Sequence, residues 1–237
     1  MEIIILKINQ YKEKDGIIDA ISKEGKHTFL VRSLFDPKSK NAGLNNPLTI
    51  AEVELANNNG RYPYDVISSS IVLFTPVILQ TNLLHMASIM LINEVTNFLL
   101  SDEEKPEMFV DLSETIHEIK KNENPLKVVV PYLAKILKIS GYDFEVSECI
   151  TCGSKKNIVT FSFNDGGFIC GNCYTPEIPC EFNRQQMLTI REAFLTSGPA
   201  ITNSEISDDE LMFIIDKFFE FILDSYGYRV KSFDLLK

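Results

Sequence analysis

The chain has 237 residues, of which 45% are hydrophobic and 24% are charged. This composition is close to that of globular domains and excludes a wholly disordered chain, and the length allows one or two domains. The formal net charge of −10 excludes a nucleic-acid binder whose whole surface is basic. The charge is uneven, because residues 1–79 hold nine Lys and Arg against nine Asp and Glu, so the remainder carries the whole negative excess.

The N-terminal sequence predicts no secretory signal, because it lacks a cationic region and a small-residue cleavage site. Residues 71–89 are strongly apolar, but Pro76 and His85 are among the residues that interrupt them. We therefore expect a strand end followed by a buried helix rather than a membrane span. Five cysteines, an odd number grouped in pairs, favour a reduced compartment and a metal over a disulfide framework. We expect a cytoplasmic protein without membrane contact.

The first third of the sequence predicts short β-strands. Apolar or alternating runs rich in β-branched and aromatic residues occupy residues 2–9, 16–22, 26–33, 48–55 and 65–74. Gly25 and the Asn-Asn-Asn-Gly run at residues 57–60 supply turn signals between them. Five strands in so short a segment predict a small barrel, and an OB-fold has that number of strands. An SH3-like barrel is the alternative, which the sequence alone does not separate from it.

The rest of the sequence predicts mainly helices. Apolar residues recur at helical spacing in residues 81–100, 106–121, 125–139, 184–196 and 207–226. Pro131 should start or kink the third of these helices, and Ser207 with Glu210 forms a capping-box pattern before the last. The period changes from 2 to 3.6 near residues 74–81. The predicted fold class is therefore α+β, with an OB-fold barrel at 1–78 and a helical domain at 79–237.

A cysteine module lies within the predicted helical domain, at residues 147–180. Its pairs Cys149-x-x-Cys152 and Cys170-x-x-Cys173 are separated by 17 residues, which matches the spacing of zinc ribbons. Two thiolates on each tight turn can reach one ion, and two such turns complete a tetrahedron. Because all four positions are cysteine, the pattern predicts structural Zn²⁺ rather than a catalytic ion. A lost metal and dithiol redox chemistry remain alternatives, and Cys180 is expected to be a small buried residue without a role.

No catalytic site emerges from the sequence. The three histidines lack a partner at metal or triad spacing, and the phosphate-loop, dinucleotide and nucleophile-elbow motifs are absent. We therefore nominate no catalytic residue, and an enzyme is disfavoured.

Several short patterns, in a fixed order along the chain, resemble those of a known family. They are Tyr11-x-Glu13-x-Asp15 with Gly25, Arg32-Ser33 through Lys38-Ser39-Lys40, Asn93-Glu94, the cysteine module with Phe161-Ser162 and Gly166-Gly167, and Tyr226 through Lys231-Ser232. With its order of barrel, helices, four cysteines and helices, nearly the whole chain resembles the RecO family of bacterial recombination mediators. The cysteine module is the most specific part of this resemblance.

The resemblance implies a non-enzymatic protein of DNA repair and homologous recombination, acting in the RecF pathway. Such a protein binds single- and double-stranded DNA, anneals complementary strands and helps RecA to load on strands coated by single-stranded-DNA-binding protein (SSB). The implied partners are RecR, the acidic C-terminal tail of SSB and, indirectly, RecA and RecF. The neutral barrel departs from the excess positive charge expected of it, so DNA binding should depend on a partner.

A groove that follows a DNA backbone needs cations and stacking rings. The candidate phosphate contacts, all in or beside predicted barrel strands and loops, are Lys26, Arg32, Lys38, Lys40 and Arg61. The candidate stacking rings are Phe29, Phe35, Tyr62 and Tyr64, although the alternation around Phe29 also predicts a core position. The alternative function is a zinc-ribbon adaptor that binds only protein partners, which the acidic net charge would suit.

Overall fold

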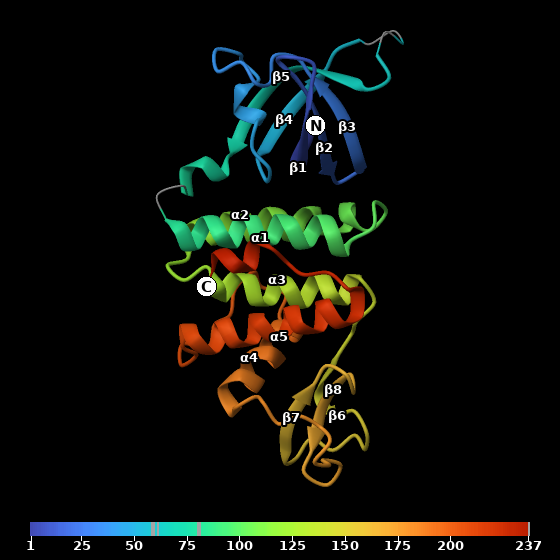
Figure 1. Cartoon of the computed structure of the whole chain (residues 1–237), viewed down its shortest axis with the longest axis vertical. Helices are drawn as coiled ribbons and strands as arrows, with labels where there is room; N and C mark the ends of the chain where they lie inside the picture. Colours follow the sequence, from blue (N-terminus) through green and yellow to red (C-terminus); the bar gives the residue numbers. More distant parts are fainter. Residues whose placement is uncertain (58–59, 61, 80–81, 237) are drawn as a thin grey trace. The chain divides into compact units, whose positions relative to one another are not determined.

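The computed structural model describes residues 1–57, 60, 62–79 and 82–236. The chain forms two compact units: unit 1 comprises Met1–Lys120 with Ser232–Lys237, and unit 2 comprises Lys121–Lys231 (Figure 1). The predicted boundary at 78/79 marks the passage from strands to helices, whereas the first helices after it cluster with the barrel. A functional boundary at that position stays a prediction.

The barrel of unit 1 has five strands, close to the predicted ones. They are β1 (Glu2–Tyr11), β2 (Asp15–Ser22), β3 (Gly25–Val31), β4 (Ile50–Leu55) and β5 (Asp65–Phe74). The sheet closes in the order β1-β2-β3-β5-β4, with β1 antiparallel to β4 and β3 parallel to β5. This Greek-key barrel of five strands confirms the predicted OB-fold rather than the SH3-like alternative.

Strand pairing brings three loops to one end of the barrel. Tyr11 pairs with Asp15, Gly16 with Val31, and Phe29 with Asp65. The β1–β2 turn, the segment after β3 and the β4–β5 loop therefore lie together, at the top of Figure 1. We call this the loop end of the barrel. The β2–β3 turn lies at the opposite end.

The barrel interior is filled by apolar side chains from alternate strand positions, as period-2 alternation predicts. The buried members on the strands are Ile3, Ile5, Ile18, Ala20, Phe29, Val31, Ala51, Val53 and Ile67. Leu34 and Leu44, from the segment between β3 and β4, join them. Phe29 is 1% exposed, so its interpretation as a core residue is confirmed.

Unit 1 also contains helices α1 (Leu83–Leu99) and α2 (Phe109–Lys121). The C-terminal turn η4 (Ser232–Leu235) returns to α1, where the backbone N–H of Ser232 donates to the Glu94 carboxylate at 2.7 Å. The apolar residues 71–89 form the end of β5, a short 3₁₀ turn and the start of α1, as expected. Among the described residues, no helix combines the length and the hydropathy that crossing a membrane requires.

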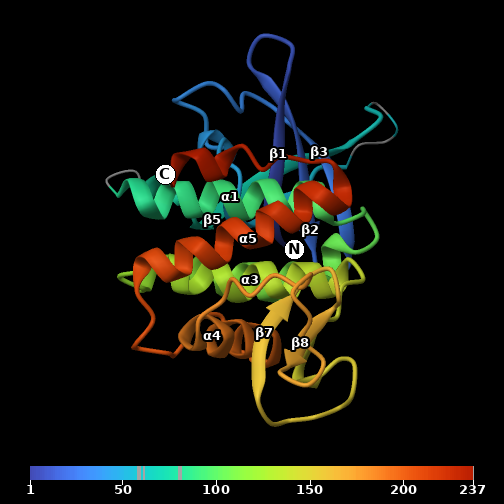
Figure 2. The same cartoon turned by 60° about the horizontal axis from the view of Figure 1, so that its bottom comes forward.

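Unit 2 consists of three helices and a small sheet. The helices are α3 (Leu126–Ile139), α4 (Arg184–Leu195) and α5 (Asp208–Tyr226), and they run side by side (Figure 2). The strands are β6 (Glu145–Cys149), β7 (Ile158–Ser162) and β8 (Gly167–Cys170), in the order β6-β8-β7. The alternating pattern of residues 158–163 predicts β7, whereas no pattern predicts the strands that carry Cys149 and Cys170.

Helix α3 begins at Leu126 and continues through Pro131, so the predicted start of the helix at Pro131 is wrong. Proline lacks the N–H that would bond to the carbonyl four residues earlier. That carbonyl, of Lys127, instead accepts from the backbone N–H of Ile201 at 2.8 Å. A segment distant in sequence thus satisfies the group that the proline leaves open.

An aromatic cluster joins the small sheet to the helices of unit 2. Phe161 of β7, 2% exposed, lies 5.9 Å from Phe182 and 6.5 Å from Phe194 of α4, measured between ring centroids. Phe163 lies 5.3 Å from Phe218 and 5.1 Å from Phe221, both on α5. The cysteine module is therefore packed into the core of unit 2.

Candidate metal centre and nucleic-acid interface

The four paired cysteines converge on one point. The Sγ atoms of Cys149, Cys152, Cys170 and Cys173 all lie within 4.8 Å of one another, and those of Cys152 and Cys170 are 3.6 Å apart. A tetrahedral zinc site with bonds of about 2.3 Å has sulfur–sulfur edges of about 3.8 Å. The cluster therefore has the dimensions and the donor set of a closed four-cysteine metal site.

Each cysteine pair begins where a strand ends. Cys149 ends β6 and Cys170 ends the neighbouring β8, so sheet pairing sets the two pairs side by side. The first turn closes with Gly153 N–H donating to the Cys149 carbonyl at 2.8 Å, and Gly153 has the left-handed φ of +70° that such a turn needs. The second closes with Cys173 N–H donating to the Cys170 carbonyl at 3.0 Å.

The acidities of the thiols differ strongly. Burial opposes ionisation of Cys149, but hydrogen bonds from the backbone N–H groups of Cys170, Cys152 and Thr151 lower its pKa to about 6. The hydrogen bond with Cys152, and then desolvation, raise the pKa of Cys173 to about 12. Four thiolates so close together need a cation to neutralise them, which a divalent ion such as Zn²⁺ supplies when bound.

Cys180 lies outside this cluster. Its side chain is exposed, with Sγ 3.5 Å from the Val159 carbonyl, so the expectation of a buried cysteine is wrong. The residue lies between Pro179 and Glu181 in an irregular surface segment, where the local pattern gives no burial signal.

A cleft of about 380 Å³ opens at the loop end of the barrel. Its lining brings together three of the predicted DNA-binding residues, Arg32, Lys40 and Tyr62. Arg32 Nη2 donates to the Tyr62 hydroxyl at 2.8 Å, and its guanidinium carbon lies 5.2 Å from the ring centroid. Lys40 Nζ donates to the Ser68 carbonyl at 2.5 Å. Among the described residues that line the cleft there is no carboxylate.

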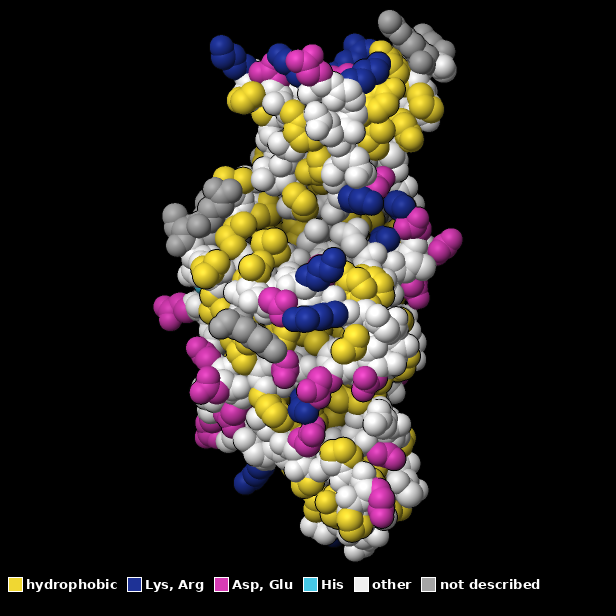
Figure 3. Space-filling view, viewed as in Figure 1, with side chains coloured by type: hydrophobic (Ala, Val, Ile, Leu, Met, Phe, Trp, Pro, Cys, Tyr) yellow, Lys and Arg dark blue, Asp and Glu magenta, His cyan; other side chains and the backbone are white. Residues whose placement is uncertain are grey.

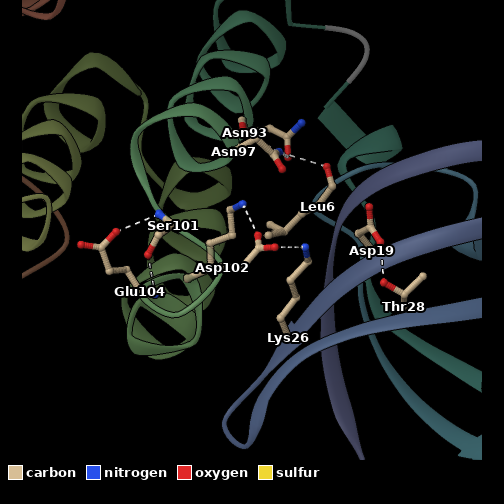
Figure 4. A network of polar contacts seen from close by, with 10 residues as sticks. Leu6, Asp19, Lys26, Thr28, Asn93, Asn97, Ser101, Asp102 and Glu104 are labelled. Carbon is tan, nitrogen blue, oxygen red and sulfur yellow. Dashed lines mark hydrogen bonds and ion pairs between the residues drawn. The ribbon is translucent and has the colours of Figure 1, made fainter. Parts of the chain in front are cut away.

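The remaining predicted cations are placed differently. Lys38 is exposed on the segment that carries Lys40 but does not line the cleft. Arg61 lies outside the described residues. Lys26 belongs to the β2–β3 hairpin at the opposite end, where it reaches Asp102 at 2.5 Å, and Lys105 contacts the same carboxylate at 2.9 Å (Figure 4). The geometry therefore groups Arg32 with Lys40 and separates them from Lys26.

The predicted stacking rings also divide. Tyr62 lines the cleft, and Tyr64 is 37% exposed on the same loop. Phe29 is buried in the barrel core, and Phe35 packs half-buried against it. Of the predicted stacking rings, Tyr62 is therefore the one that belongs to the lining of the cleft.

The β1–β2 turn adds residues that the sequence analysis does not nominate. The Lys12 ammonium lies 5.2 Å from the Tyr11 ring centroid, and Lys14 pairs with Asp36 at 3.1 Å. Lys and Arg side chains gather at this end, among Asp and Glu, in Figure 3. The β1–β2 and β4–β5 loops of OB-folds commonly bind oligonucleotides. The predicted OB-fold would therefore have been a reason to add Lys12, in the β1–β2 turn, to the candidate phosphate contacts.

The fold and these sites define a class: an OB-fold barrel, with a cation- and tyrosine-lined cleft, joined to a helical unit that contains a four-cysteine centre. Comparison with known proteins agrees. The family model described as "Recombination protein O N terminal" matches residues 1–72, and "Recombination protein O C terminal" matches residues 80–186. The chain belongs to the RecO family, whose members serve DNA recombination and repair.

Similar curated proteins from several bacteria are named "DNA repair protein RecO". The protein of Halalkalibacterium halodurans is 24% identical over 72% of this chain and 66% of its own length. Those of Oceanobacillus iheyensis and Bacillus subtilis are 26% and 22% identical, over 73% and 92% of this chain and 68% and 86% of their own lengths. The chain thus spans about two thirds of the first two relatives.

Proposed function

We propose that this chain is a non-enzymatic mediator of DNA repair and homologous recombination. It binds single- and double-stranded DNA at the loop end of its barrel and anneals complementary strands. With RecR, in the RecF pathway, it helps RecA to load on single strands coated by SSB, whose acidic C-terminal tail it engages. It acts in the cytoplasm, at the nucleoid.

The cleft formed by Arg32, Lys40 and Tyr62 carries this proposal. The cleft offers two cations and an aromatic ring, and no carboxylate lies on its described lining. A DNA single strand has complementary groups, because cations can bind its phosphates while an aromatic ring stacks on a base. The Lys40 ammonium, now on the Ser68 carbonyl, can exchange that neutral acceptor for a phosphate. Arg32 can do the same and so uncover the ring of Tyr62.

The cysteine cluster holds structural Zn²⁺ in this proposal, with Cys149, Cys152, Cys170 and Cys173 as its ligands. A closed four-thiolate site leaves no position for a substrate, so its contribution is folding free energy. The aromatic contacts of Phe161 transmit that stabilisation to the helices of unit 2.

Annealing of two complementary oligonucleotides, with and without cognate SSB, tests the function. The parent chain should accelerate annealing. Arg32→Glu with Lys40→Glu should lower the rate at least tenfold, because both cleft cations become repulsive to phosphate. Lys23→Glu reverses one exposed charge in the β2–β3 turn, at the opposite end of the barrel, and is the control for position. Equal loss in both variants would reject the cleft, and no annealing by the parent chain, even with RecR present, would reject the function.

The second candidate is an adaptor that binds only proteins through its zinc ribbon. The net charge of −10 favours it, since DNA would then be repelled from most of the surface. The same annealing experiment separates the two, because an adaptor would give no acceleration at any salt concentration.

A further inference from the structure

Unit 2 contains a second cavity of about 380 Å³, formed by residues 141–144, 163–166 and Phe221. We call it the acidic aromatic pocket. Its walls are four aromatic rings: Tyr142 meets Phe221 edge-on at 4.9 Å, and Phe163 stacks on Phe221 at 5.1 Å and meets Phe144 edge-on at 5.3 Å. The volume lies within the roughly 300–1,000 Å³ range of ligand pockets.

The polar part of this pocket is negative. Asp143 and Asp165 lie on its lining, and the described lining residues include no Lys or Arg. Lys138 pairs with Asp143 at 3.2 Å from outside, but both side chains are more than half exposed. Such surface pairs are weak and exchange readily, so the carboxylate stays able to bind a second cation.

A smaller hollow beside this pocket also combines aromatic rings with carboxylates, and there a cation of the chain pairs with the carboxylates. It shares Phe163 and Phe221 with the acidic aromatic pocket and has a volume of about 160 Å³. Lys217 lies on its lining, with Nζ 2.9 Å from the Glu181 carboxylate and 2.8 Å from the Glu220 carboxylate. In the smaller hollow the chain thus supplies its own cation to a set of rings and carboxylates. The acidic aromatic pocket also has rings and carboxylates, but no Lys or Arg lies on its described lining.

The chemistry of the pocket selects among ligands. A phosphate chain would meet two carboxylates and be repelled, which disfavours DNA even though bases stack on rings. A purely apolar side chain would desolvate the carboxylates without pairing them. A guanidinium satisfies both features, because its flat face stacks on aromatic rings while its N–H groups bond to carboxylates.

We propose that the acidic aromatic pocket binds an arginine side chain from a basic segment of a partner protein. Asp143 and Asp165 would pair with the guanidinium, and Phe163 and Tyr142 would contact its face. The acidic aromatic pocket belongs to unit 2, whereas the proposed DNA cleft belongs to unit 1. The proposal for the pocket therefore does not depend on the function proposed for the cleft.

Fluorescence anisotropy of a labelled Gly-Arg repeat peptide on the full chain tests the proposal. A peptide with citrulline in place of arginine has nearly the same shape without the charge. The arginine peptide should bind at least tenfold more tightly. Asp143→Asn with Asp165→Asn should weaken its binding about tenfold, because both pairing charges are lost. Phe163→Leu should weaken it severalfold, since it removes the ring but keeps apolar volume.

Matched controls separate the pocket from a general attraction to an acidic protein. Asp209→Asn removes an exposed charge of the same unit outside the pocket and should change binding less than twofold, as should Arg32→Glu with Lys40→Glu in the barrel. Unfolding curves establish that each variant is folded. Equal affinity for both peptides would overturn the proposal, as would equal effects of Asp209→Asn and of Asp143→Asn with Asp165→Asn. Loss of oligonucleotide rather than peptide binding in Phe163→Leu would also overturn it.

Discussion

Two adjacent glycines after β7 have different structural requirements. A Cβ on Gly167 would lie 2.3 Å from the backbone carbonyl oxygen of Glu145, because β6 and β8 pair closely at that point. Gly166 has a φ of +90° but has open space around its Cα. Gly167 is therefore required by packing, whereas Gly166 is required only by its backbone conformation.

Gly167→Ala should destabilise unit 2 by about 3 kcal/mol, because a backbone atom must move to admit the methyl group. Gly166→Ala should cost only about 1–2 kcal/mol, the strain of a left-handed alanine. Urea unfolding of both variants measures the difference. Equal losses of unfolding free energy in the two variants would mean that β6 and β8 can move apart at Gly167 at little cost.

Lys40 gives a second prediction for a single residue. If its ammonium contacts one phosphate of a bound single strand, Lys40→Ala should weaken binding and reduce the slope of log affinity against log salt by about 0.7. Binding isotherms at several salt concentrations measure the slope. Lys23→Ala, exposed at the other end of the barrel, should keep the parent slope. An unchanged slope in Lys40→Ala would remove this residue from the interface.

Among the secondary-structure elements, the starts of α4 and α5 are tied together. The predicted capping box of Ser207 and Glu210 is confirmed, and Asn183 with Gln186 forms a second one at α4. Asn183 Nδ2 also donates to Glu210 Oε1 at 2.8 Å, so the cap of one helix bonds to the cap of the other. The hydrogen bond from the Ser207 backbone, and then that from Asn183, hold the pKa of Glu210 below its usual 4.5.

This contact predicts a specific pH dependence. Because the folded-state pKa of Glu210 is lowered, its stabilisation is complete above about pH 4.5 and is lost as the pH falls through the lower folded-state value. Glu210→Gln should therefore make the free energy of unfolding less dependent on pH in that acidic range. Denaturant unfolding between pH 3 and 6 tests this, with Glu205→Gln, outside both caps, as control. The same acid dependence in Glu210→Gln and the parent would contradict it.

For the whole molecule, the two candidate sites lie in different units. The candidate metal centre lies in unit 2, whereas the proposed DNA cleft lies in unit 1. If the barrel binds DNA as proposed, its neutrality within a chain of net charge −10 predicts tighter binding when a partner adds positive charge.

Removal of the metal should therefore affect unit 2 first. Metal analysis of purified protein should find about one zinc per chain, and chelation or Cys152→Ser should lower its melting temperature by the loss of metal-linked folding free energy. Cys180→Ser, outside the cluster and exposed, should retain both zinc and stability. If the purified protein contains no zinc and chelators do not change its melting temperature, the centre is vestigial.

What the sequence by itself determined is local. Strand and helix periods depend on neighbours within a few positions, and they predicted the five barrel strands, the main helices and the capping box at Ser207. The spacing of the four cysteines likewise predicted their convergence, because a tight turn brings each pair together. Only tertiary structure decided the rest: the OB-fold strand order, the bond from Ile201 that lets α3 pass Pro131, and the grouping of Arg32 with Lys40 apart from Lys26. These features are contacts between residues far apart in the chain, and the periodicity of a segment carries no information about which distant segment will meet it.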